Sequence, residues 1–165
     1  MFESLSWDWN QVLTDLVRVG IAFVLAFPIG WERSRTARSL GLRTFPLVAI
    51  ASCGYMLIAK HAPDADAASI SRIMQGLLAG IGFIGGGAIL KDQGMVYGLA
   101  TAASIWNTGA VGAAVALDRG EIAVVLSIIN FVLLRVLTPI VPTDDYQSKD
   151  DTEALPRDDP GNGGD

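Results

Sequence analysis

Long runs without a charged residue constrain this chain more than any other feature. Five runs, of 13, 16, 18, 25 and 13 residues, lie at 19–31, 44–59, 73–90, 93–117 and 122–134. A helix needs about 20 mostly apolar residues to cross the hydrocarbon core of a bilayer. The shorter runs reach that length when flanking residues lie at the membrane interface and long side chains snorkel. We therefore predict an all-α, polytopic membrane helical bundle with about five transmembrane helices, at about 12–31, 44–60, 73–90, 96–117 and 121–141.

Three alternative readings fit the sequence less well. A soluble helical bundle would show an amphipathic stripe on each helix, whereas these runs are apolar all round. An outer-membrane barrel would show alternating polar and apolar residues, and that alternation is absent. A cleaved signal peptide would begin with basic residues and end at a small-residue cleavage site. The first run instead follows Glu3 and Asp8 and ends in Trp31, Glu32 and Arg33, so we expect a retained first helix.

Composition excludes several functional classes. The chain is 51% apolar and 18% charged, against about 25% charged residues in soluble domains. One cysteine, Cys53, excludes a disulfide scaffold, and a single histidine, His61, disfavours a zinc site. Residues 1–141 carry ten basic and nine acidic side chains, a net charge of +1, so no basic surface for nucleic acid remains. We expect no cofactor, and the sequence leaves the question of a metal open.

Charge placement also predicts the orientation in the membrane. Arg33, Arg35, Arg38 and Arg43 follow the first helix, with Glu32 as the only acid among them. Cytoplasmic loops of membrane proteins are rich in Lys and Arg, so we place this loop in the cytoplasm. The chain then divides into an extracytoplasmic N-terminus at 1–11, a transmembrane domain at 12–141 and a cytoplasmic tail at 142–165. The tail has two basic and eight acidic residues and is expected to be disordered, with a docking role as the alternative.

Glycines mark a predicted packing surface in the third helix. Gly76 and Gly80 are four positions apart, and so are Gly82 and Gly86. This spacing lets helix backbones approach closely in lipid. We predict helix packing, within the chain or in a homodimer, at Gly76, Gly80, Gly82, Gly85 and Gly86. A helix break at 85–87 that lines a cavity is the alternative. The stretch 80–85 also reads G-x-G-x-x-G, but no preceding strand or later acidic residue supports a dinucleotide site.

The fourth predicted helix is the most polar one. Thr101, Ser104 and Thr108 share a face, and Trp106 and Asn107 lie near mid-span. In lipid such groups hydrogen-bond a neighbouring helix or their own i−4 carbonyl, and a polar lining for an ion or small ligand is the alternative. No ionisable residue lies deep in a predicted span, which counts against a self-sufficient pump. No catalytic constellation is present, so we expect no enzyme.

The best candidate for a functional cluster surrounds Glu32. Pro28 and Gly30 are expected to break or kink the first helix just before it, which would free carbonyls for hydrogen bonding. Arg43 and Thr44 begin the second helix across the short basic loop. We predict that Glu32, Arg33, Arg43 and Thr44 form one hydrogen-bonded cluster at the cytoplasmic end, which could extend to the Thr101 face.

Four motifs resemble those of the MgtC/SapB family of bacterial inner-membrane proteins. They are P-I-G-W-E-R at 28–33, G-L-R-T-F-P-L-V-A at 41–49, Q-G-L-L-A-G-I-G-F-I-G-G-G-A-I-L at 75–90 and Y-G-L-A-T-A-A-S-I-W at 97–106. The resemblance covers about 12–140 and implies a small multi-span protein with an outside N-terminus. The residues that match family motif positions are Glu32, Arg33, Arg43, Thr44, Gly82, Gly85, Thr101 and Trp106.

The resemblance also implies a range of functions. Family members are tied to growth at low magnesium and to survival inside macrophages, and they are thought to act on partners that include the F-type ATP synthase. We therefore expect a regulatory or interaction role in magnesium homeostasis or membrane energetics, with a small-cation transporter or channel for Mg²⁺ or K⁺ as the alternative. Expected partners are the lipid bilayer and a membrane protein or second copy. Longer members add a folded cytoplasmic domain, which this short form is expected to lack.

Overall fold

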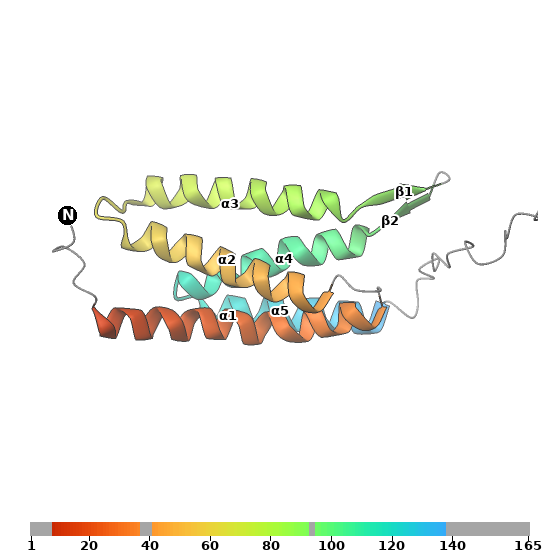
Figure 1. The fold of residues 1–165 in the computed structure, drawn as a ribbon, viewed down its shortest axis with the longest axis horizontal. Coiled ribbons are helices and arrows are strands. Elements are labelled where there is room, and N and C mark those ends of the chain that lie inside the picture. Colours follow the sequence, from red (N-terminus) through yellow and green to blue (C-terminus); the bar gives the residue numbers. More distant parts are fainter. Residues whose placement is uncertain (1–7, 37–40, 93–94, 138–165) are drawn as a thin grey trace, which may run out of the picture.

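The computed structural model describes residues 8–36, 41–92 and 95–137. Five helices dominate these residues: α1 Trp9–Thr36, α2 Gly41–His61, α3 Ala67–Gly87, α4 Leu99–Ala116 and α5 Gly120–Leu137. Figure 1 shows them side by side along the long axis, with successive helices running in opposite directions. The predicted all-α bundle of five helices is confirmed.

Each of these helices is long and apolar enough to cross a membrane. The outer helices also expose large apolar side chains, among them Phe83 on α3, which is 85% exposed. Apolar side chains of this kind are stable in contact with lipid. The helices also pair the backbone polar groups, as the hydrocarbon core of a bilayer requires. The fold is therefore that of a multi-pass membrane protein.

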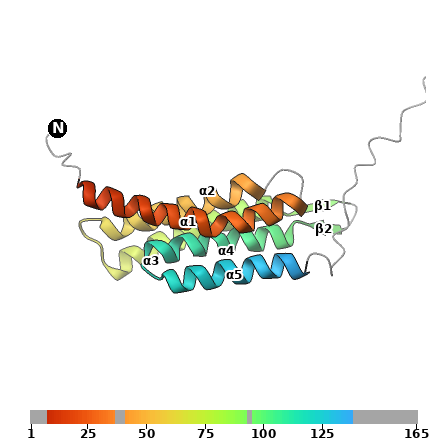
Figure 2. The ribbon, with the colours of Figure 1, turned by 90° about the horizontal axis from the view of Figure 1, so that it is seen from below.

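Two helices form the centre of the bundle. Half of the membrane-spanning window is buried in α2 and in α4, against only 6% in α3. α4 contacts all four other helices, whereas α3 packs mainly against α2 and α4 and lies at one edge (Figures 1 and 2). The larger apolar core joins α1, α2, α4 and α5 and contains Ala22, Ala26, Ala49, Cys53, Met56, Leu57, Val111, Ala114, Val115, Ala116 and Ala123. Cys53 is thus a packing residue, as its place in an apolar run predicts.

Small residues set how closely the central helices approach. A Cβ atom added to Gly112 of α4 would lie 2.2 Å from the Ala49 carbonyl oxygen of α2. One added to Gly41 of α2 would lie 2.6 Å from the Gly30 carbonyl oxygen of α1. Both contacts are with backbone, which cannot rotate away, so glycine is required at these two positions.

Most helices extend beyond the charge-free runs. α3 begins at Ala67 and not near 73, because Asp66 caps it by accepting a hydrogen bond from the Ser69 amide. α1 continues unbroken through Pro28 to Thr36, and α3 continues unbroken to Gly87. A helix break near 28–30 is therefore absent, and α3 ends at Gly87 without the break at 85–87 that the sequence left as an alternative. Charged residues such as Arg72 lie inside helices near their ends, where the membrane interface tolerates them.

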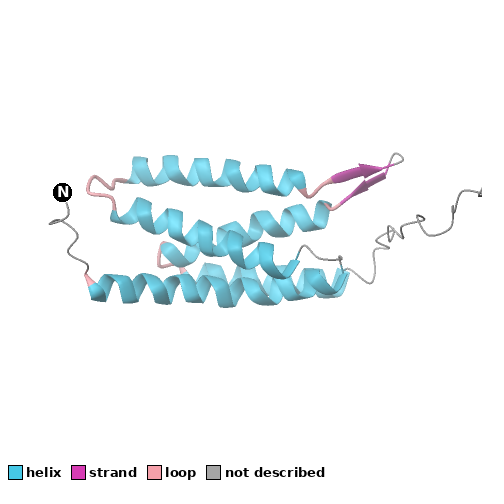
Figure 3. Cartoon of the chain, in the orientation of Figure 1, coloured by secondary structure: helices cyan, strands magenta, loops and turns pink. Residues whose placement is uncertain are grey.

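A pair of short strands between α3 and α4 was not predicted. β1 Leu90–Asp92 pairs antiparallel with β2 Met95–Tyr97, with Leu90 opposite Tyr97, and the pair extends from one end of the bundle (Figure 3). Gly98 follows with φ +84°, a left-handed conformation that suits glycine. Residues 142–165, the predicted tail, lie outside the described residues.

Candidate functional site

Two charged side chains are buried at the C-terminal end of α1. Glu32 is 8% exposed and Arg33 is 7% exposed. Arg33 donates a hydrogen bond through Nη2 to Thr101 Oγ1 at the start of α4. Arg135 near the end of α5 donates through Nη1 to Glu32 Oε1 at 3.3 Å. We call Glu32, Arg33, Thr101 and Arg135 the Arg33 cluster, and the end of the bundle that holds it the Arg33 end.

The helical repeat explains this arrangement. Consecutive residues on an α-helix point about 100° apart, because the helix has 3.6 residues per turn. Glu32 and Arg33 can therefore meet two different neighbours of α1, and they contact α5 and α4 respectively. The cluster ties together three helices that lie far apart in the sequence.

The structure brings together only part of the predicted cluster. Glu32, Arg33 and Thr101 lie together as expected, but Arg43 is exposed and Thr44 is half-buried. Within the described residues neither Arg43 nor Thr44 contacts Glu32 or Arg33 through a hydrogen bond or ion pair. The second helix begins beside α1 at Gly41, but Arg43 and Thr44 are not part of the cluster.

One member of the cluster was missed, and one matched motif residue stands apart. Arg135 supplies the ion pair to Glu32, and its position near the end of the last charge-free run was the only available signal. Trp106 is 52% exposed on α4 and takes no part in the cluster. Its indole therefore faces the surroundings of the bundle.

A cavity of about 420 Å³ opens beside the Arg33 cluster, between α4 and α5. Arg33 forms part of its wall, and most of the remaining wall is apolar. The lining residues are Arg33, Ala100, Ala103, Ser104, Asn107, Ile129, Asn130, Leu133, Leu134 and Leu137. We call this space the α4–α5 cavity.

The polar groups of α4 and α5 bond backbone carbonyls near this cavity. Thr108 Oγ1 donates to its own i−4 carbonyl, that of Ser104, at 2.8 Å. Asn107 Nδ2 donates to the Leu126 carbonyl of α5 at 3.3 Å, and Asn130 Nδ2 donates to the Ser104 carbonyl at 3.5 Å. These bonds are the two kinds that the sequence predicts for polar side chains in lipid.

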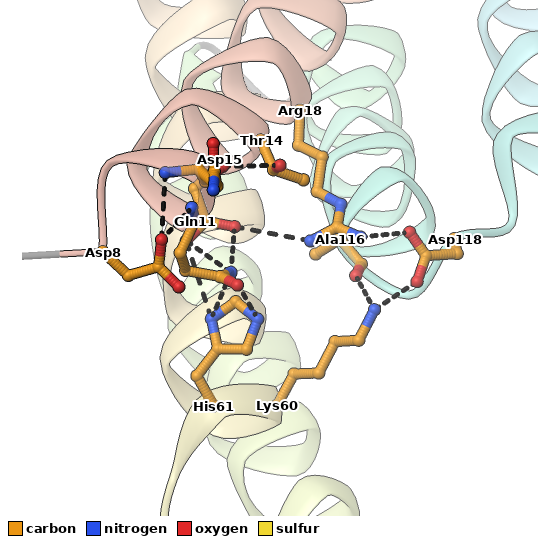
Figure 4. A network of polar contacts seen from close by, with 10 residues as sticks. Asp8, Gln11, Thr14, Asp15, Arg18, Lys60, His61, Ala116 and Asp118 are labelled. Carbon is orange, nitrogen blue, oxygen red and sulfur yellow. Dashed lines mark hydrogen bonds and ion pairs between the residues drawn. The ribbon is translucent and has the colours of Figure 1, made fainter.

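A second polar network lies at the opposite end of the bundle (Figure 4). Asp118, in the turn between α4 and α5, accepts hydrogen bonds from Lys60 of α2 and, at 2.7 Å, from Arg18 of α1. Arg18 also contacts Asp15, three residues earlier on α1, at 3.4 Å. The carboxylate of Asp15 in turn lies 3.6 Å from His61. We call this end of the bundle the Asp118 end.

Asp118 is the central residue of this network. The hydrogen bond from Lys60, and after it the bond and charge of Arg18, hold the pKa of the Asp118 carboxyl below its usual range. Its φ of +58° is left-handed, a conformation that aspartate tolerates better than most side chains. Asp118 thus fixes the turn and joins α1, α2 and the α4–α5 connection.

The predicted glycine surface divides in two. Gly85 packs against α4, because an added Cβ would lie 3.3 Å from the Ala102 carbonyl oxygen. The other predicted glycines have no neighbour within 4 Å of an added Cβ among the described residues, namely Gly76, Gly80, Gly82 and Gly86. Close helix contacts at Gly30, Gly41, Gly109 and Gly112 were missed. Packing of Gly82 and Gly86 against a second copy stays a prediction.

Among residues 8–36, 41–92 and 95–137, no three His, Cys, Asp or Glu side chains lie close enough together to hold a metal ion. The charged groups that the structure does gather are the Arg33 cluster and the Asp118 network.

Comparisons with known proteins agree with the motif resemblance. The sequence model of the MgtC family matches residues 19–142. An uncharacterized protein of Synechocystis is 35% identical over 146 residues, which are 88% of this chain and 60% of the relative. The "Putative magnesium transporter YhiD" of Escherichia coli K12 is 33% identical over 128 residues, 73% of this chain and 59% of the relative. "Protein MgtC" of Brucella melitensis is 32% identical over 140 residues, 85% of this chain and 58% of the relative.

The chain thus spans 58–60% of the length of these relatives. No solved structure matches the chain.

Proposed function

Because the chain belongs to the MgtC family, we propose that it is a non-enzymatic regulatory protein that acts in magnesium homeostasis or membrane energetics through a membrane-protein partner. The partner class is a transporter or the ATP synthase, as the family resemblance implies. Within the chain, the Arg33 cluster is the site on which this regulation depends.

The proposed orientation places the Arg33 end in the cytoplasm. Arg33 and Arg35 lie at this end of α1, and Arg38 and Arg43 follow in the sequence. Basic residues are retained on the cytoplasmic side of membrane proteins. The N-terminus is then outside, and the chain after α5 continues in the cytoplasm.

The observation that carries the proposal is the buried charge of Arg33 in the wall of the α4–α5 cavity. Arg33 and Arg135 carry two positive charges against the one negative charge of Glu32, so the cluster has a net charge of +1. A divalent cation that entered here would meet net repulsion, which burial strengthens. The arrangement favours a fixed interaction site over a path for Mg²⁺.

A magnesium transporter is the second candidate function. The name of the Escherichia coli relative favours it. So do the polar residues that reach the inner part of the α4–α5 cavity, Ser104, Asn107 and Asn130. The two candidates differ in one requirement, since a transporter must move the ion itself across the bilayer.

Growth complementation at low magnesium tests the proposed site. Glu32→Gln keeps the shape of the side chain and removes the charge that Arg135 contacts. We expect it to abolish complementation in a host that lacks its own MgtC-family protein, with the protein level in the membrane near wild type. Glu121→Gln is the matched control, because Glu121 lies at the opposite end of the bundle with its side chain 63% exposed. Full complementation by Glu32→Gln would overturn the proposed role of the cluster.

A further inference from the structure

We infer that the α4–α5 cavity binds one acidic phospholipid, with the phosphate on Arg33 and one acyl chain along the apolar wall. The lipid site shares Arg33 with the proposed regulatory site, but its test, retention of a lipid, does not depend on the role in magnesium homeostasis. It also requires no particular orientation, because either leaflet can supply a phospholipid.

The charge of Arg33 is incompletely compensated. Within the described residues its guanidinium makes one hydrogen bond, to the neutral hydroxyl of Thr101, and no ion pair. The Nε atom is buried and has no hydrogen-bond partner there. A buried cation with a free donor is costly unless an anion compensates it. The planar guanidinium also presents paired donors that match two oxygens of a phosphate, so a phosphate is the expected anion.

The cavity has the dimensions of an acyl-chain groove. Its volume of about 420 Å³ lies within the range of small-molecule sites, roughly 300–1,000 Å³. Along α4 the lining runs from Ala100, at the Arg33 end, to Asn107, seven residues deeper. At 1.5 Å per residue this is roughly 10 Å, about a third of the hydrocarbon thickness.

The rims of the cavity face the surrounding lipid. Ala100 and Ala103 on α4 are exposed, and so are Ile129 and Leu133 on α5. An acyl chain can therefore enter sideways from the bilayer. Arg33 lies one turn before the end of α1, close to the depth where headgroup phosphates lie. A free inorganic phosphate would reach Arg33 but leave the apolar wall uncovered, which favours the phospholipid.

Native mass spectrometry of the purified full-length chain in detergent tests this site. Dioleoyl phosphatidylglycerol is compared with dioleoyl phosphatidylcholine, which has the same acyl chains and no net charge, and glycerol 3-phosphate serves as the headgroup alone. We expect one phosphatidylglycerol to be retained, with a preference over phosphatidylcholine of roughly tenfold or more from one charge-assisted hydrogen bond. Equal retention of both lipids, or equally tight binding of glycerol 3-phosphate, would overturn the inference.

Two pairs of variants locate the site. Arg33→Gln should abolish the preference for phosphatidylglycerol, whereas Arg35→Gln, an exposed arginine on the same helix end, should retain it. Ala103→Phe fills the groove without altering any charge and should remove both lipids. Ala79→Phe, on the exposed part of α3, should not.

If Arg33→Gln and Arg35→Gln reduce the preference for phosphatidylglycerol equally, the lipid is attracted to the basic surface in general. That result would overturn the proposed site. Unchanged retention in Ala103→Phe would do the same. This second variant leaves the Arg33 cluster intact, so it decides the question even if Arg33→Gln fails to fold.

Discussion

Two glycine-to-alanine substitutions should change stability in opposite directions. In Gly112→Ala the new Cβ would lie 2.2 Å from the Ala49 carbonyl oxygen, whereas ordinary contact begins at 3.4 Å, so α2 and α4 must separate by about 1.2 Å. Overpacking of this kind costs about 1–3 kcal/mol, and contact with rigid backbone favours the upper end. The gain in helix propensity from Gly to Ala offsets only about 0.5–1 kcal/mol. Gly112→Ala should therefore lose about 2 kcal/mol of folding free energy.

Gly82→Ala isolates the gain in helix propensity from Gly to Ala. In the part of the chain that the structure describes, no atom lies within 4 Å of its added Cβ. Only the gain in helix propensity then remains, and this variant should be unchanged or slightly more stable. Cys53 provides the assay, because it is the only cysteine and is fully buried in the core. Thermal unfolding in detergent is followed with a thiol-reactive fluorophore that labels Cys53 on exposure.

We expect the melting temperature of Gly112→Ala to fall by several degrees and that of Gly82→Ala to stay level or rise. An unchanged Gly112→Ala would refute the close approach of α2 to α4. Equal losses in both variants would show that Gly82 also packs against a helix, which must then belong to a second copy.

Three further predictions follow from other parts of the chain. Asp118→Asn should lower the melting temperature at pH 7, and this loss should shrink only as the pH falls from the ordinary aspartate pKa of about 3.9 through the lower pKa of the folded state, because the carboxyl stabilises the fold only while it is ionised. A loss that does not shrink over this acid range would contradict the ion-pair role. Reporters fused after Arg38 and after Val141 should both lie in the cytoplasm and one after Asp66 outside, and fusions at 38 and 141 on opposite sides would contradict five spans. Deletion of 145–165 should leave expression and the melting temperature unchanged, since that segment has few apolar residues to bury, and loss of the folded membrane region would show that the tail docks.

The helices could be predicted from the sequence because lipid excludes charge. Each charge-free run lies mostly within a helix, and the errors lie at the ends, where residues such as Arg18 and Arg72 are still helical. The short strands at 90–97 gave no comparable signal, because six residues are too few to show a period.

The partners within the site could not be predicted in the same way. These helices are apolar nearly all round, so their pattern does not encode which face of α1 meets α4 and which meets α5. The pairing of Glu32 with Arg135, instead of Arg43, depends on those faces. The packing partners of the glycines could not be predicted either. The spacing of Gly82 and Gly86 indicates close helix packing but does not identify the neighbouring helix. Gly112, which does pack, has no glycine four positions away, where the residues are Thr108 and Ala116.

Reconstitution of the full chain in liposomes that contain a magnesium-sensitive dye tests the central claim most directly, with a potassium-sensitive dye in parallel. A regulatory protein with a net positive Arg33 cluster should give Mg²⁺ entry no faster than protein-free liposomes, at any external concentration. Saturable Mg²⁺ entry that Glu32→Gln slows, while Glu121→Gln does not, would contradict the regulatory account and establish the transporter.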